Sequence, residues 1–117
     1  MNDCLRVKQK KSKLEKYLDC SLDVLYKWIE FQFDSEMNWS NYGSYWEIDH
    51  ILCKSHFDHL NEEELLLLCW NFRNLRPCTK EENMKKGKKV DYQLYYKNIS
   101  LATEFFGYVG IFFRGRL

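Results

Sequence analysis

The sequence lacks a zinc-ribbon cysteine pattern, a long apolar run and any large net charge. Its five cysteines are odd in number, widely spaced and include no Cys-x-x-Cys pair, which argues against a zinc ribbon and against a secreted disulfide framework. The charged start has no apolar core segment of the kind that a signal peptide needs. The apolar run 105–113 is broken by Gly107 and Gly110 and is much shorter than the roughly 20 residues of a membrane span. We therefore expect an intracellular, soluble protein with reduced thiols and no membrane partner.

The net charge is only +1, so its distribution along the chain is more informative than its sum. Residues 1–16 carry six basic and two acidic side chains, and residues 80–89 carry five basic and two acidic ones. The stretch 17–79 between them carries four basic and eleven acidic side chains. Two basic ends around an acidic middle are compatible with a face that follows a phosphate backbone. Simple solvation of the lysine-rich ends is the alternative that charge alone leaves open.

The chain is rich in aromatic residues, which supply core area to a single domain of 117 residues. Neither a repeat nor a low-complexity linker interrupts its hydrophobic patterning. The expected elements are helices over about 14–18, 22–33, 62–70, 79–87 and 92–106, a strand over 45–51 and an extended piece over 75–77. Ser21, Asn61 and Thr79 are the expected N-caps, and Pro77 limits the second strand to an edge or a strand end. Residues 108–117 carry no clear pattern.

Asp49 and His50 are adjacent at the end of the expected first strand. A carboxylate is a hard oxygen ligand suited to Mg²⁺ or Mn²⁺, and an imidazole titrates near neutral pH and can take a proton from water. Neighbouring strand residues point to opposite faces, so one ion does not use both unless the strand ends or bends there. Taken alone, such a pair is more often a surface pair or a satisfied structural histidine than a catalytic site.

A wider pattern surrounds this pair. Residues 46–58 read W-E-I-D-H-I-L-C-K-S-H-F-D, and residues 71–89 read N-F-R-N-L-R-P-C-T-K-E-E-N-M-K-K-G-K-K. Upstream, residues 37–43 read M-N-W-S-N-Y-G. Together these segments resemble the HNH (ββα-metal) endonuclease family, in particular its phage and large-virus branch, over about residues 18–89. The motifs of that branch run roughly W-x-I-D-H-I-x-P-x-S-x-F-D and, later, N-L-x-P-L-x-x-x-E-N-x-x-K-G.

The resemblance implies an α+β fold with a small ββα-metal core, in which a two-stranded antiparallel ribbon and a helix hold one divalent metal ion, flanked by additional helices. It implies that His50 is the general base and that Asp49 and Asn83 are the protein ligands of the metal ion. Asn74 is implied to fix the inter-strand loop through backbone hydrogen bonds and so to orient His50. Lys86 is implied to steady the scissile phosphate. The expected ion is Mg²⁺ or Mn²⁺.

Basic residues beside these positions are candidates for nucleic-acid contacts, with plain surface solvation as the alternative. They are Arg73, Arg76, Lys85, Lys88 and Lys89. The aromatic segment from Tyr92 to Phe113 is expected to be core that closes over the ββα unit, and a stacking platform for bases is the alternative.

The sequence departs from the family pattern at Cys53, Cys78 and Asn71, where relatives usually carry Pro, Leu and His. None of these is a metal or base position, so the departures leave the implied chemistry in place. Cys53, Cys69 and Cys78 flank the implied site, and zinc binding there is conceivable. Buried reduced thiols are the ordinary interpretation.

The resemblance implies a metal-dependent endonuclease that hydrolyses phosphodiester bonds of double-stranded DNA, as a monomer or a homodimer. The expected organisation is a basic segment over 1–17, a nuclease domain over 18–90 and an aromatic C-terminal extension over 91–117 that packs on the domain. The alternatives are a catalytically silent DNA-binding module of HNH fold and an interaction protein that uses its aromatic C-terminus. By analogy with the branch we expect a viral or phage protein, acting in the host cytoplasm or nucleus.

Overall fold

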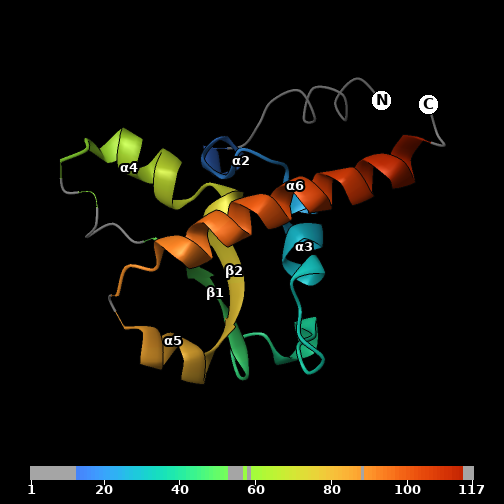
Figure 1. The fold of residues 1–117 in the computed structure, drawn as a ribbon, viewed down its shortest axis with the longest axis horizontal. Coiled ribbons are helices and arrows are strands. Elements are labelled where there is room, and N and C mark those ends of the chain that lie inside the picture. Colours follow the sequence, from blue (N-terminus) through green and yellow to red (C-terminus); the bar gives the residue numbers. More distant parts are fainter. Residues whose placement is uncertain (1–12, 53–56, 58, 88, 115–117) are drawn as a thin grey trace.

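The fold is α+β, with one antiparallel two-stranded ribbon and several helices around it (Figure 1). A computed structural model describes residues 13–52, 57, 59–87 and 89–114, with side chains as far as Val109. The strands are β1 (Trp46–His50) and β2 (Leu75–Thr79). The α-helices are α2 (Lys13–Leu18), α3 (Leu22–Phe31), α4 (Glu62–Cys69), α5 (Lys80–Lys86) and α6 (Tyr92–Arg114). Two short 3₁₀ helices are η1 (Trp39–Asn41) and η3 (Phe72–Asn74).

The ribbon pairs β1 with β2 so that Asp49 lies opposite Arg76 and Ile48 lies opposite Pro77. Backbone hydrogen bonds just beyond the strands join Ile51 to Asn74 and Lys80 to Tyr45 in the same register. Because hydrogen-bonded and non-hydrogen-bonded pairs alternate along an antiparallel ladder, Pro77 falls in a non-hydrogen-bonded pair. Its missing N–H therefore costs the ribbon no bond, which explains how a proline sits in mid-strand.

The two faces of the ribbon carry different helices. Ile48 and Leu75 face the hydrophobic core that includes α3, and both pack in its cluster. Glu47 and Asp49 face α5 instead, because each forms an ion pair with a lysine of that helix. This alternation along β1 makes a layered unit of α3, ribbon and α5.

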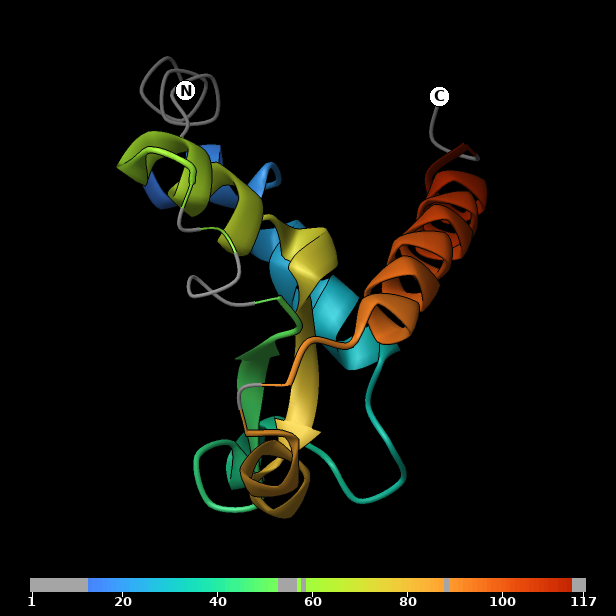
Figure 2. The same cartoon turned by 60° about the vertical axis from the view of Figure 1, so that its left-hand side comes forward.

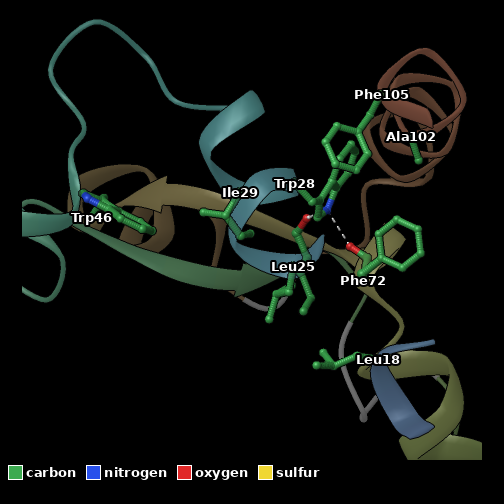
Figure 3. Packing of buried hydrophobic residues seen from close by; sticks show 9 residues of the cluster. Leu18, Leu25, Trp28, Ile29, Trp46, Phe72, Ala102 and Phe105 are labelled. Carbon is green, nitrogen blue, oxygen red and sulfur yellow. Dashed lines mark hydrogen bonds between the residues drawn. The ribbon is translucent and has the colours of Figure 1, made fainter. Parts of the chain in front are cut away.

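Trp28 is the centre of the core (Figure 3). Its ring is fully buried and lies against the rings of Phe72 and Phe105. The indole N–H donates to the carbonyl oxygens of Phe72, at 2.7 Å, and of Leu75, at 3.1 Å. One side chain of α3 therefore joins η3, β2 and α6.

Helix α6 crosses the molecule and stands apart from the α2–α4 pair, as Figure 2 shows. Its buried side chains are Asn98, Ala102 and Phe105, which recur at helical spacing. Asn98 donates from Nδ2 to the carbonyl oxygens of Arg73, at 2.7 Å, and Leu75, at 3.2 Å. The opposite face exposes aromatic rings, among them Tyr96 at 64 %. The helix is therefore partly core, as its composition predicts, and partly surface.

The three predicted N-caps are confirmed. Ser21, Asn61 and Thr79 each accept a hydrogen bond from a backbone N–H three residues later. Two helix ends were predicted wrongly. Helix α3 ends at Phe31, and Phe33 packs on Trp46 from outside the helix. The helix expected over 92–106 continues to residue 114.

No helix in the described part of the chain is both long and apolar enough to cross a membrane. The basic segment predicted over 1–17 is described only from Lys13 onwards, where it enters α2. That short helix is tied to α4, since Lys16 and Tyr17 both bind the carboxylate of Glu63, at 3.0 and 2.9 Å.

Candidate active site

Asp49 is the next-to-last residue of β1, and its side chain lies on the face of the ribbon that α5 covers. It is 8 % exposed, and its Oδ2 accepts hydrogen bonds from two cations. Arg76 donates from Nε at 3.1 Å, and Lys86 donates from Nζ at 2.9 Å. Arg76 reaches this position because it is the cross-strand partner of Asp49 in the ribbon register. The result is a buried carboxylate with positive charge gathered at one oxygen.

His50 is the last residue of β1 and points to the opposite face from Asp49, as strand alternation predicts. Its ring meets Trp70 edge-on, with centroids 4.5 Å apart. The Nε2 atom is buried and has no hydrogen-bond partner among the described residues. Burial lowers the pKa of His50 below its ordinary value of 6.5; the Asp49 carboxylate opposes this shift and the Lys86 ammonium adds to it. The imidazole is therefore neutral near pH 7.

Asn74 binds the chain that leaves β1 after His50. Its side chain is 1 % exposed, and its Oδ1 accepts the backbone N–H of Leu52 at 2.8 Å. Its Nδ2 donates to the carbonyl oxygens of Leu52 and Cys69, both at 2.9 Å. These bonds hold the start of the inter-strand loop and the end of α4 together. That this orients His50 for catalysis stays a prediction.

Helix α5 returns beside β1 after β2 ends, and it carries Asn83 and Lys86. The helix starts at the Thr79 cap and ends at Gly87, whose φ of 55° favours glycine. Lys86 donates not only to Asp49 but also to the carbonyl oxygen of His50, at 2.6 Å. Asn83 is half-buried and lies one turn earlier, on the same side of the helix as Lys86. Both residues therefore belong to the face that meets the ribbon.

The donors on this face suit a hard divalent cation. Asp49 offers a carboxylate and Asn83 an amide oxygen, and such ions favour oxygen ligands with several positions left to water. Two cationic side chains already converge on Asp49 Oδ2, so this is a place where positive charge is stabilised. Within the described ranges no three His, Cys, Asp or Glu side chains gather as a metal site, and a site of one carboxylate and one amide does not need them.

The structure does not bring all predicted nucleic-acid contacts to this place. Arg73 lies on the α6 side, where it pairs with Asp19 at 3.3 Å and its guanidinium lies over the Phe72 ring. Lys85 pairs with Glu81 along the exposed side of α5. The remaining two candidates are Lys89, which is exposed, and Lys88, which lies outside the described residues.

The two described thiols near the ribbon are buried, and no metal-binding group of His, Cys, Asp or Glu side chains is found among the described residues. Cys69 and Cys78 are both buried, and burial raises the pKa of the Cys78 thiol. Cys78 accepts a hydrogen bond from Arg76 at 3.5 Å. Cys53, the third thiol of the conceivable zinc set, lies outside the described residues.

Two contacts of the site were missed from sequence. Trp70 packs edge-on against the His50 ring, although it is distant in the sequence and lies at the end of α4. Arg76 was predicted to bind DNA, and the structure shows it paired with Asp49. The Arg76 pair follows from the strand register, which hydrophobic alternation alone does not define. No local signal marks Trp70.

Comparison with known proteins yields viral relatives. No family model matches the chain, and no solved structure matches it significantly. The uncharacterized protein L426 of Acanthamoeba polyphaga mimivirus is 47% identical over 98 residues, which cover 83% of this chain and 42% of that protein. The uncharacterized protein L246 of the same virus is 34% identical over 88 residues, covering 75% and 38%. The chain thus spans less than half the length of these relatives, whose names state no activity.

Proposed function

We propose that this chain is a metal-dependent DNA endonuclease of the HNH type, with His50 as the general base. The observation that carries the proposal is the buried Nε2 of His50, which has no hydrogen-bond partner among the described residues and belongs to an imidazole beside a buried carboxylate. An unsatisfied buried polar atom is costly and is a recognised mark of a functional site. The surrounding motif, with Asn74, Asn83 and Lys86 at the spacing of the HNH family, supports the same assignment.

The proposed reaction hydrolyses one phosphodiester bond. His50 takes a proton at Nε2 from a water molecule, whose oxygen bonds to phosphorus while the bond from phosphorus to the 3′ oxygen breaks. The departing 3′ oxygen takes a proton from solvent, and His50 afterwards returns its proton to solvent. The products are a 5′-phosphate and a 3′-hydroxyl. A base must be unprotonated to act, so the lowered pKa of His50 keeps it competent at neutral and mildly acidic pH.

Asp49 and Asn83 would hold the divalent ion between the ribbon and α5. When bound, that ion would supply positive charge beside the leaving oxygen as a Lewis acid. Asn74 would keep the loop after β1 in place, and the exposed lysines of α5 would attract the anionic DNA backbone. Of the residues in these roles, Asp49 and Lys86 are in direct contact, and Asn83 lies one turn before Lys86 on the same side of α5.

The test is nicking of supercoiled plasmid by the full chain with Mg²⁺ or Mn²⁺. We expect the wild type to cut and His50→Ala to lose at least about 100-fold in rate, the usual contribution of a general base. The matched control is His59→Ala, because His59 is an exposed histidine of the loop after β1. Equal cutting by His50→Ala and the wild type would remove His50 as the base.

A catalytically silent DNA-binding module is the second candidate. The ion pairs of Asp49 with Arg76 and Lys86 favour it, because both cations already satisfy the carboxylate. This candidate predicts DNA binding that weakens steeply with salt and gives no metal-dependent product. Binding measured at several salt concentrations beside the nicking assay separates the two functions.

A further inference from the structure

The ammonium of Lys86 joins both residues at the end of β1. Its Nζ lies 2.9 Å from Asp49 Oδ2 and 2.6 Å from the carbonyl oxygen of His50. The side chain is only 13 % exposed, although it belongs to the last turn of a surface helix. A lysine held in this way is bound to the candidate metal ligand and is not free to contact DNA.

The two cations on Asp49 are held differently. Arg76 comes from the neighbouring strand, is placed by the ladder register, and has a second contact at Cys78 Sγ. Its planar, permanently charged guanidinium is a fixed partner. Lys86 reaches Asp49 on a flexible stem from the end of a short helix, and its ammonium is a compact, strongly hydrated charge. Of the two, Lys86 is the partner that can leave without disturbing the ribbon.

We propose that Lys86 is an exchangeable counter-cation of Asp49, which a divalent ion displaces and which then turns to the DNA phosphate. This inference rests on the proposed function. Its physical basis is that two cations at one buried carboxylate oxygen repel each other more strongly than they would in water. Binding of the ion and release of Lys86 are thereby coupled. Lys86 becomes available to bind the DNA phosphate only when the ion is present.

The experiment is a calorimetric titration of the full chain with Mn²⁺ in the absence of DNA. Lys86→Met keeps the apolar stem and removes the competing charge, so we expect Mn²⁺ affinity to rise about tenfold, which corresponds to roughly 1.4 kcal/mol. The matched control is Lys80→Met, because Lys80 pairs with Glu47 across the same helix and strand but at 3.9 Å and with both side chains about half exposed. We expect that variant to bind Mn²⁺ as the wild type does.

Cleavage at saturating Mn²⁺ supplies the second readout. We expect Lys86→Met to cut more slowly than the wild type even though it binds the ion more tightly, because the phosphate contact is lost. Lys86→Arg keeps a charge at this position, so its Mn²⁺ affinity should stay near that of the wild type. If Lys86→Met does not fold, as judged by circular dichroism, Lys86→Gln replaces it with the same expectation.

The failure of the inference and the failure of the proposed function are distinguishable. Asp49→Asn and Asn83→Ala test the metal ligands themselves. If they weaken Mn²⁺ binding while Lys86→Met leaves it unchanged or weaker, the exchange is overturned and the metal site stands. If neither ligand variant changes the Mn²⁺ affinity of the wild type, both the exchange and the proposed metal site fall.

Discussion

At the scale of single residues, the state of His50 depends on what covers it. Its ring is partly buried at the end of β1, with the Trp70 indole edge-on against it and no partner at Nε2 among the described residues. Burial of this kind disfavours the charged imidazolium, and it outweighs the attraction of the neighbouring Asp49 carboxylate. Under the proposed function, the burial that lowers the pKa of His50 would therefore help to set the pH range over which it acts as a base.

Replacing Trp70 with alanine should raise the pKa of His50 towards its ordinary value of 6.5, because burial is the main cause of its depression. The unprotonated fraction of the base falls as pH drops through its pKa, so the acidic limb of the cleavage profile should move to higher pH. Histidine resonances followed by NMR across pH 4 to 8 measure the shift directly. Trp70→Phe retains an aromatic edge and should shift less; an unchanged pKa in the alanine variant would show that other groups provide the cover.

Part of the geometry of the candidate site could be predicted from sequence. Strand alternation predicts that Asp49 and His50 face opposite sides of the ribbon, and Asn74 was expected to hold the inter-strand loop, whose start it binds at Leu52. The catalytic roles of these residues stay predictions. The pairing of Asp49 with Arg76 could not be foreseen, because it depends on which residue lies opposite in the ladder. The contact of Trp70 with His50 joins two residues that are distant in the sequence, and no local pattern encodes it.

At the scale of elements, α5 is the part of the site with the least support of its own. It has seven residues, which is too short for stability from helix propensity. Thr79 caps it by accepting the Glu82 backbone N–H at 3.1 Å and donating to the Glu82 carboxylate at 3.0 Å. Its other end is attached to β1 through Lys86. The Thr79 cap thereby positions the start of the helix that carries Asn83, independently of the Lys86 contact.

Thr79→Ala should destabilise the protein by about 1 kcal/mol, the usual cost of losing a helix N-cap. Urea unfolding followed by circular dichroism measures it. Thr103→Ala is the matched control, because Thr103 is exposed within α6 and its hydroxyl only donates back to the Ile99 carbonyl at 3.4 Å. We expect that change to stay within about 0.5 kcal/mol. Equal losses of unfolding free energy in the two variants would show that the Thr79 cap contributes no more stability than an exposed threonine within a helix.

Helix starts were easier to predict than helix ends. The caps at Ser21, Asn61 and Thr79 are local side-chain interactions and can be recognised in the sequence. The end of α3 is set by tertiary packing, since Phe33 leaves the helix to contact Trp46. The continuation of α6 beyond residue 106 includes Gly107, which lowers helix propensity and hid the helix from pattern analysis.

At the scale of the whole molecule, α6 belongs to the same hydrophobic core as the ribbon. Phe105 is 2 % exposed and contacts the rings of Trp28 and Phe31 from α3. Ala102 is buried in the same cluster. Composition predicts that the aromatic C-terminal segment supplies core, but it does not identify the face that does so.

Phe105→Ala should destabilise the protein by about 3 kcal/mol, because removing a buried phenyl ring leaves a cavity. The free energy of unfolding from urea titration is the measurement. Tyr96→Ala is the control on the exposed side of α6, where the ring is 64 % exposed, and we expect a change within about 0.5 kcal/mol. If Phe105→Ala lowers the free energy of unfolding as little as the control does, α6 does not contribute to the stability of the hydrophobic core.

The backbone carbonyl group of Leu75 joins the ribbon to α3 and α6. The oxygen of Leu75 accepts hydrogen bonds from Trp28 and Gln32 of the α3 region and from Asn98 of α6, at 3.1, 3.3 and 3.2 Å. Leu75 is also the residue that faces His50 across the ladder. Under the proposed function, random mutagenesis screened for loss of DNA cutting should therefore recover substitutions of Asn98, because its hydrogen bond helps to place the residue opposite His50 in the ladder.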